Sequence, residues 1–218
     1  MSKFYSDQHR ALQDRFDSRR LADFLEGGHV HPEIAPEEQA FIENLDMFFL
    51  STVDATGQPT VSYKGGAKGF VKVTGPSELI FPCYDGNGMF YSMGNIQVEP
   101  RIGLLFIDFE TPHRLRVQGR ATIDFEHESL ADYPGAQFMA VLAVESVWIN
   151  CSRYIHKHQK LDTSKYVPKA GRETPFPAWK RIDIVQPSLP VQDQGKTERL
   201  GGEITLDDYV GLVASGDS

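Results

Sequence analysis

With 218 residues, 40% of them hydrophobic and 24% charged, the chain is long enough for one domain with appendages or for two small domains. Its formal net charge of −8 argues against a general nucleic-acid binder, and no apolar run approaches the ~20 residues that span a membrane. The N-terminus lacks the apolar core of a signal peptide, and Cys83 and Cys151 are the only cysteines. We therefore expect a cytoplasmic protein with two reduced thiols and with neither nucleic-acid nor membrane partners.

Two helices are expected before the first strand. Residues 6–26 alternate apolar and charged faces, and Gly27 and Gly28 are expected to end that helix. A second helix begins at Pro36, because proline is favoured in the first helical turn and acidic side chains follow it. Residues 1–45 are thus expected to form an N-terminal helical extension.

An H-x-H pair, His29 and His31, lies between these two helices. Such a pair can chelate a metal ion, but no carboxylate or cysteine stands at ligand spacing. We interpret the segment as a loop and expect no metal site.

Residues 46–160 are rich in short β-type runs separated by turns. Gly75 and Pro76 separate two of the runs, and Pro82 is expected to stop the second of these. Six or so strands with hairpin turns and little helix between them favour a closed antiparallel barrel, and so a mainly β fold with peripheral helices. The runs are Met47–Val53, 59–63, 70–73, 79–81, 102–109, 114–125 and 138–150, with short helices at 89–98 and 128–132.

The C-terminal part has a different character. Residues 151–159 are expected to form one or two helical turns, and prolines then interrupt the chain. Ile182–Val185 is expected to add one more contact or strand, and residues 205–213 a short helix. We expect residues 161–218 to form an irregular extension packed on the barrel.

Glycines and lysines are interleaved just after the first hairpin. Gly65, Gly66 and Gly69 let a ligand approach the backbone, and Lys64, Lys68 and Lys72 add positive charge. This combination suits an anionic ligand. A glycine-rich hairpin with solvated lysines is the alternative interpretation.

Several motifs occur in an order typical of a known family. They are FFLSTVDATGQPTVS, GGAKGFVKV, the DGNG turn, SMGNI, and GLLFID followed by RLRVQGRATI. In order and spacing they resemble the FMN-binding split barrel of the pyridoxamine 5'-phosphate oxidase-like family. The resemblance implies a split β-barrel that binds FMN, or alternatively FAD, a deazaflavin or haem, and a homodimer with the cofactor at the subunit interface.

The resemblance also implies which residues contact the cofactor. Lys68, Lys72 and the backbone from Gly69 to Val71 are the first choice. The full set of expected cofactor-binding residues is Lys64, Lys68, Gly69, Phe70, Val71, Lys72, Pro82, Cys83, Ser92, Asn95 and Arg114. No catalytic residue is assigned.

The sequence departs from the family's pattern at three places. Tyr91 and Ser92 stand where an Arg-Lys pair is typical, and Ala67 stands where an arginine is typical. The C-terminal Arg-x-His element that recognises pyridoxal phosphate is missing from residues 160–218. We therefore expect a flavin-dependent oxidoreductase with an unassigned small-molecule substrate or electron donor, not a typical pyridoxamine phosphate oxidase. The alternative is a non-catalytic flavin- or haem-binding module for storage or sensing.

Overall fold

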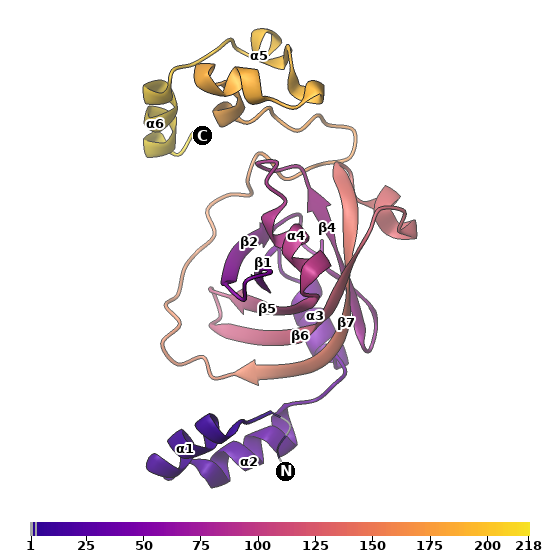
Figure 1. The fold of residues 1–218 in the computed structure, drawn as a ribbon, viewed down its shortest axis with the longest axis vertical. Coiled ribbons are helices and arrows are strands. Elements are labelled where there is room, and N and C mark those ends of the chain that lie inside the picture. Colours follow the sequence, from indigo (N-terminus) through magenta and orange to yellow (C-terminus); the bar gives the residue numbers. More distant parts are fainter. Residues whose placement is uncertain (1, 3) are drawn as a thin grey trace. The chain divides into compact units, whose positions relative to one another are not determined.

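The computed structural model describes Ser2 and residues 4–218, in two units of which the first ends at Asp162 and the second spans Thr163–Ser218 (Figure 1). The strands are β1 (Met47–Val53), β2 (Pro59–Gly65), β3 (Lys72–Gly75), β4 (Glu78–Tyr84), β5 (Arg101–Asp108), β6 (His113–Asp124) and β7 (Ala136–Asn150). The α-helices are α1 (Asp7–Arg15), α2 (Arg19–His29), α3 (Pro36–Glu43), α4 (Tyr91–Val98), α5 (Lys196–Arg199) and α6 (Leu206–Ser215). The 3₁₀ helices are η1 (Glu128–Asp132), η2 (Ala178–Arg181), η3 (Asp183–Ser188) and η4 (Val191–Asp193).

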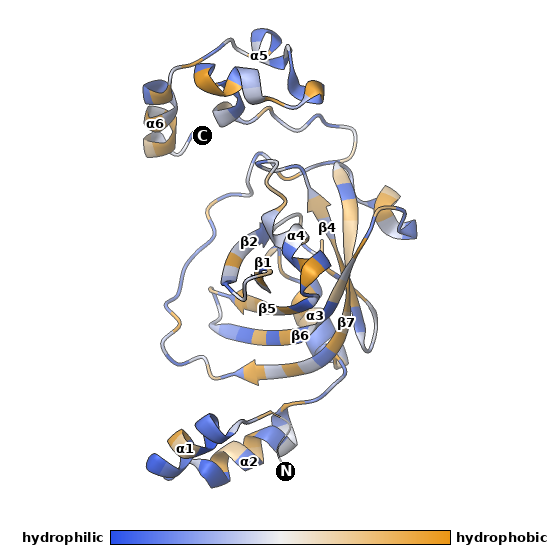
Figure 2. Cartoon of the chain, in the orientation of Figure 1, coloured by the Kyte–Doolittle hydropathy of each residue, from blue (hydrophilic) through white to orange (hydrophobic). Residues whose placement is uncertain are grey.

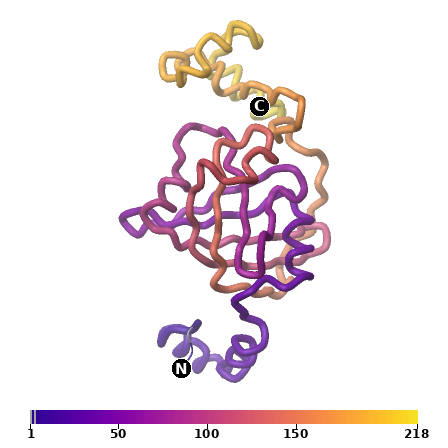
Figure 3. The backbone as a smooth tube through the Cα atoms, turned by 90° about the vertical axis from the view of Figure 1, so that its right-hand side faces the viewer, coloured from indigo at the N-terminus to yellow at the C-terminus, as the bar shows by residue number. Residues whose placement is uncertain are grey.

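The first unit is built on one seven-stranded sheet, which confirms the mainly β fold. Its order is β2-β1-β5-β6-β7-β4-β3, and neighbouring strands are antiparallel. The sheet curls back on itself (Figures 1 and 3). The hydrogen-bonded order nevertheless has two ends, β2 and β3, so the barrel is split between them, and the expected full closure by strand pairing is not observed.

The core follows from the alternation of side chains along the strands (Figure 2). Phe48 of β1 is fully buried, and its ring lies 5.1 Å from that of Phe81, 5.3 Å from Phe106 and 5.8 Å from Phe70. Burying one such side chain contributes roughly 1.5–3 kcal/mol. This aromatic centre holds β1, β4 and β5 around a common interior.

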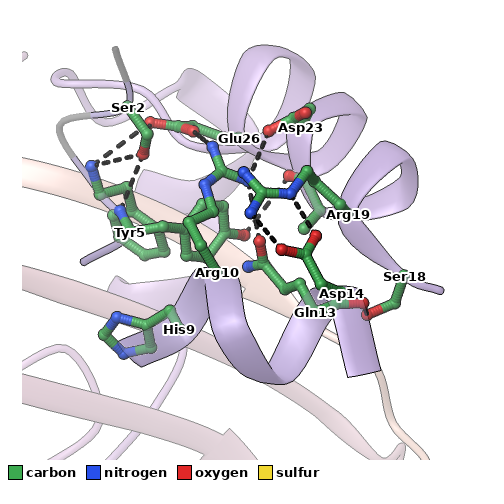
Figure 4. A network of polar contacts seen from close by, with 12 residues as sticks. Ser2, Tyr5, His9, Arg10, Gln13, Asp14, Ser18, Arg19, Asp23 and Glu26 are labelled. Atoms are coloured by element: carbon green, nitrogen blue, oxygen red, sulfur yellow. Dashed lines mark hydrogen bonds and ion pairs between the residues drawn. The ribbon is translucent and has the colours of Figure 1, made fainter. Parts of the chain in front are cut away.

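The N-terminal helix predicted over residues 6–26 is in fact two helices. Asp17 adopts a left-handed conformation, with φ of 51°, and this breaks the helical hydrogen-bonding pattern between α1 and α2. Gly27 and Gly28 lie inside α2 and do not end it. Ion pairs then join the two helices, with Arg10 2.6 Å from Asp23 (Figure 4).

Phe70 and Val71 were predicted in a strand, and that prediction is wrong. β2 continues to Gly65, and the chain then turns so that β3 begins only at Lys72. Both side chains enter the core, with exposed fractions of 4% and 1%. The apolar run therefore reflects burial of a turn rather than an extended strand.

Pro82 does not stop its strand, contrary to expectation. It lies inside β4, opposite Met139 of β7. β3 pairs with β4 only as far as Ile80, so Pro82 lies where one side of the strand has no partner. A residue without an N–H group is tolerated at such an edge.

The helical turns predicted at residues 151–159 are also absent. The chain turns at Tyr154, with φ of 70°, and then runs extended. The His158 amide donates to the Phe109 carbonyl at 3.1 Å, and Lys160 pairs with Asp46. A backbone hydrogen bond and an ion pair therefore attach this segment to the barrel.

The second unit contains short helices in place of the expected strand at Ile182–Val185. Ile182 lies between η2 and η3 and forms one isolated parallel bridge with Ile204, and residues 183–185 belong to η3. The helix predicted at residues 205–213 is confirmed as α6, where the Thr205 side chain accepts from the Asp208 amide. Among the described residues, no helix is both long and apolar enough to cross a membrane.

Candidate functional site

In the first unit, no side chain caps the N-terminus of helix α4. Its N-cap residue is Phe90, held in the left-handed region with φ of 47° and unable to cap the helix with its side chain. The first backbone N–H groups of a helix have no partner within it and carry partial positive charge. An anionic group is favoured at such an end.

Polar side chains from two strands lie against this helix. The hydroxyls of Ser62 on β2 and Ser92 on α4 share a hydrogen bond of 3.1 Å. One turn further on, the Asn95 amide donates to the Thr52 hydroxyl at 3.1 Å. We call Thr52, Ser62, Lys64, Cys83, Ser92, Met93 and Asn95 the α4 cluster.

Lys64 is the cation of the α4 cluster. It follows Ser62 by two residues on β2, so both side chains leave the strand on the same side. Burial lowers the pKa of its ammonium group, and Cys83 lies close enough to counteract this in part. Over the described residues, no hydrogen bond or ion pair of the Lys64 side chain is found, so its charge is uncompensated.

Cys83 is a buried thiol beside this lysine. Its Sγ donates to the Met93 thioether sulfur at 3.3 Å. Burial raises the pKa of Cys83 to about 12, although the nearby Lys64 acts in the opposite direction. The thiol is therefore neutral, and it is not a reactive nucleophile at neutral pH.

The later part of the glycine-lysine segment, residues 67–72, lies against the end of α3. The Gly69 amide donates to the Leu45 carbonyl at 3.0 Å, and the Phe70 amide donates to the Ala67 carbonyl at 2.9 Å. Lys68 and Lys72 are exposed. Because two of the expected backbone donors are already used within the chain, the contact of Gly69–Val71 with a cofactor stays a prediction.

Over the described residues, no hydrogen bond or ion pair joins Arg114 to the α4 cluster. The chain leaving α4 meets β6 at Ala121, whose amide donates to the Pro100 carbonyl at 2.8 Å. Arg114 lies seven residues away along the strand, which is roughly 23 Å at ~3.3 Å per residue. Its buried Nε has no hydrogen-bond partner, and neither has Oδ1 of Asn150, which faces it on β7. The structure thus brings together Lys64, Cys83, Ser92 and Asn95 of the predicted set.

A family model described as pyridoxamine 5'-phosphate oxidase matches residues 34–159, more than half of the 218 residues. The chain belongs to the pyridoxamine 5'-phosphate oxidase family. The match spans β1 to β7 and includes every member of the α4 cluster. No curated protein matches the chain.

Several solved structures are similar to the chain. HupZ of Group A Streptococcus is 20% identical, with a TM-score of 0.45, over 58% of this chain and 99% of that one. The haem storage protein HutZ from Vibrio cholerae is 19% identical, with a TM-score of 0.40, over 54% and 94%. An FMN-binding protein from Syntrophomonas wolfei is 10% identical, with a TM-score of 0.43, over 64% and 97%.

The donors of the α4 cluster fit the phosphate of FMN, the cofactor that membership of the pyridoxamine 5'-phosphate oxidase family implies. A phosphate needs hydrogen-bond donors and positive charge. Ser62 and Ser92 supply hydroxyls, Lys64 supplies an ammonium group, and the start of α4 supplies backbone amides. Lys64 and Ser92 would hold the phosphate in place of the arginine and lysine typical of the family.

Three members of the α4 cluster were not predicted from the sequence: Thr52, Ser62 and Met93. Ser62 had a signal, since it alternates with Lys64 in a strand of period two. Thr52 and Met93 had none, because their roles depend on how β1 and α4 pack.

Proposed function

We propose that this protein binds FMN and acts, as a homodimer, as a flavin-dependent oxidoreductase on a small-molecule substrate or electron donor that is not yet assigned. The observation that carries the proposal is Lys64, a half-buried and uncompensated cation on the same side of β2 as Ser62, whose hydroxyl is hydrogen-bonded to Ser92 in the uncapped first turn of α4. A buried charge without a partner is costly, so its presence favours an anionic ligand. Membership of the family makes FMN the leading candidate.

FMN, when bound, supplies the redox chemistry, so the chain needs to bind and orient it and to exclude competing reactions. Lys64, Ser62 and Ser92 would bind the phosphate. Burial of the apolar neighbours Met93 and Ile96, at 6% and 2% exposed, keeps water away from one side of this site. The nearby thiol of Cys83 stays protonated and inert.

FMN titration followed by fluorescence tests the proposal, with matched lysine variants. Lys64→Met is expected to weaken FMN binding about 10- to 100-fold, the equivalent of losing one charge-assisted hydrogen bond. Lys157→Met is the control, because Lys157 is exposed and outside both the α4 cluster and the expected cofactor-binding set. No binding to the unaltered protein at tens of micromolar would contradict the proposal.

Lys72→Ala tests the alternative placement of the phosphate. The resemblance favours Lys72, and the geometry favours Lys64. If Lys72→Ala weakens FMN binding by ~1.5–3 kcal/mol and Lys64→Met does not, the phosphate lies near Gly69 and not at α4.

The proposed homodimer would use the outward face of β2 and β1. Val61 and Tyr63 point away from the core and are 66% and 62% exposed. Phe49 of β1 continues this surface, with its ring 6.1 Å from that of Tyr63. Large neighbouring apolar side chains on one sheet face favour contact with a second chain.

Light scattering tests this assembly. We expect the mass of a dimer for the unaltered chain and a monomer for the double variant Val61→Glu with Tyr63→Glu. The matched control is Thr60→Glu, on the opposite side of the same strand. A monomer at all practical concentrations of the unaltered chain would contradict the homodimer. The free Cys151 is exposed, which fits the reducing cytoplasm that we also propose.

A non-catalytic binding module is the second candidate. One observation favours it: the α4 cluster contains no histidine, aspartate or glutamate, and burial raises the pKa of its thiol, Cys83, to about 12. An absorption spectrum of the purified protein separates flavin from haem. Turnover with NADH or NADPH then separates an enzyme from a storage or sensing module.

A further inference from the structure

The loop between α2 and α3 covers an exposed edge of the sheet. β4 pairs with β7 from Ala136 to Ala143 and then ends, whereas β6 stays paired with the other side of β7 up to Asn150. His31 pairs with the edge of β7 that β4 leaves unpaired. Its amide donates to the Val147 carbonyl at 3.1 Å, and its carbonyl accepts from the Val147 amide at 2.8 Å. An uncovered edge of this kind is prone to pair with other chains.

The His31 ring fixes this loop through both of its nitrogens. Nδ1 lies 2.6 Å from the Glu33 carbonyl oxygen, and Nε2 lies 3.2 Å from Oε1 of Glu38 on α3. Glu38 is only 5% exposed, and its other oxygen accepts from the Ala35 amide at 2.9 Å. The ring thus joins the loop to a buried carboxylate.

These contacts indicate how many protons the His31 ring and the Glu38 carboxyl group hold together. A carbonyl oxygen can only accept, so Nδ1 must carry a proton. Nε2 lies at ion-pair distance from Oε1 of Glu38, and this contact is attractive only when a second proton is on the ring or on the carboxyl group. In both cases the pair of His31 and Glu38 holds one proton more than a neutral imidazole and a carboxylate would hold together.

We propose that His31 and Glu38 form a proton-dependent clamp that fastens the N-terminal extension to β7. When the extra proton is lost, an acceptor faces an acceptor, either at Glu38 or at the Glu33 carbonyl, and the contact becomes repulsive. The loop then leaves the edge at Val147. Protonation thereby controls both the exposure of this edge and the attachment of α1 and α2.

The groups that surround the His31 ring support a clamp formed by the single pair of His31 and Glu38. From α3, Glu38 is the charged group that faces it. β7 meets the loop through the backbone of Val147, and the turn before β4 meets it through the Pro76 carbonyl, which accepts from the Ile34 amide at 2.6 Å. Over the described residues, the ring has no other hydrogen bond or ion pair.

Trp148 offers a direct readout of the clamp. It follows Val147, and its ring lies 5.2 Å from that of Phe4 in the N-terminal extension. In the full-length chain with Trp179→Phe, Trp148 is the only tryptophan. Its emission and the hydrogen-exchange protection factor of the Val147 amide are followed from about pH 5 to about pH 8, the range in which histidine is the usual titrating side chain.

We expect both signals to change in one transition as the pH rises, with the protection factor of Val147 falling about tenfold as the ion pair between His31 and Glu38 is lost. His31→Gln is expected to abolish the transition. His29→Gln is the matched control and is expected to keep it, since within the described part of the chain His29 contacts the Phe24 ring and forms no ion pair. A transition that is absent from the unaltered chain, or that is unchanged in His31→Gln, overturns the clamp.

A second measurement does not depend on the folding of a variant. The nitrogen chemical shifts of the His31 ring in the unaltered chain report directly whether the ring carries one proton or two. At low pH we expect both nitrogens protonated, or Nδ1 protonated with a proton shared between Nε2 and Glu38. An unprotonated Nδ1 at low pH overturns the clamp. Glu38→Gln is expected to move the transition, and an unmoved transition also counts against it.

Discussion

The charge of Lys64 is expected to favour binding of an anionic ligand but to destabilise the ligand-free protein. Burial lowers the pKa of its ammonium group below the ordinary 10.5, so between the two values the unfolded chain binds more protons than the folded chain. Stability of the ligand-free chain therefore rises with pH across that window. An apolar residue of similar length removes the desolvation cost.

We accordingly predict that Lys64→Met stabilises the ligand-free protein at neutral pH, raising Tm by ~2–4 °C for each 1 kcal/mol or so of stability gained. The gain is expected to shrink in alkaline buffer, where the unaltered Lys64 is neutral. Thermal melts at both pH values measure this. Lys68→Met, at an exposed position, is expected to leave Tm unchanged. A lower Tm for Lys64→Met at neutral pH would mean that the charge has a partner.

At the candidate site, the sequence predicted some of the clustered residues correctly but not the position of the first-choice lysines. Lys64, Ser92 and Asn95 were expected near a cofactor, and the structure brings them to one helix. The first-choice residues, Lys68 and Lys72, lie at the end of α3 instead. The sequence places lysines beside glycines, but it does not show which way the turn after Gly65 directs them.

Among the glycines of the described residues, Gly119 is the one whose replacement would bring a Cβ atom closest to other backbone atoms. It lies where the pairing of β6 and β7 shifts register, and a Cβ atom there would lie 2.0 Å from the Ala143 carbonyl oxygen. At Gly103 on β5, a Cβ atom would instead make ordinary contacts, 3.9 Å from the Ser51 side chain. The two positions form a matched pair on neighbouring strands.

We predict that Gly119→Ala destabilises the chain by several kcal/mol, ~3 or more, because two central strands must separate. Gly103→Ala is expected to change stability by less than about 1 kcal/mol. Urea denaturation of both variants measures the difference. Equal midpoints would show that the strands relax at the bulge.

At the scale of elements, the second unit depends on a buried ion pair. Lys180 Nζ lies 2.7 Å from Oδ2 of Asp193, both side chains are 4% exposed, and Lys196 reaches the other oxygen at 2.9 Å. Burial raises the pKa of Asp193, but the two ammonium groups outweigh it, so the pKa lies below the ordinary 3.8. The stabilisation is present above that ordinary value and is lost as the pH falls through the lowered pKa.

We predict that Asp193→Asn destabilises the second unit by ~1.5–3 kcal/mol, because Lys180 and Lys196 each lose a charge-assisted hydrogen bond to this buried carboxylate. The fluorescence of Trp179, in the full chain with Trp148→Phe, reports unfolding of this unit in urea. Asp207→Asn, at an exposed position in α6, is the control. If Asp193→Asn unfolds at the same urea concentration as the control, the ion pair contributes nothing net.

Most elements of the first unit were predictable because their signals are local. β1 is found at Met47–Val53 and η1 at Glu128–Asp132, as the alternation and the turn residues indicated. The errors occur where tertiary structure decides. Pro82 stays in β4 because β3 ends beside it. Residues 151–159 are extended because the Phe109 carbonyl holds His158 and Asp46 holds the following Lys160.

At the scale of the whole molecule, the question is whether this protein can use pyridoxamine phosphate as a substrate. Oxidation of pyridoxamine phosphate requires a second phosphate site beside the flavin and groups that orient the amine-bearing carbon. The resemblance assigns part of this recognition to a C-terminal Arg-x-His element, whereas residues 160–218 contain no histidine. That part of the chain forms its own unit and carries Asp207, Asp208 and Asp217 near its end.

We therefore predict that the flavin-loaded protein does not oxidise pyridoxamine phosphate at a useful rate. Loss of a bidentate contact to the substrate phosphate removes binding energy that would position the reacting carbon, so both affinity and rate fall. The assay is aerobic incubation with pyridoxamine phosphate, following pyridoxal phosphate and peroxide. Because ordinary enzymes turn over at ~1 s⁻¹ or faster, a rate near that value with a micromolar KM would contradict the prediction. It would also require a phosphate site formed by residues of the barrel, for which Arg116, exposed on β6, is the first variant to make.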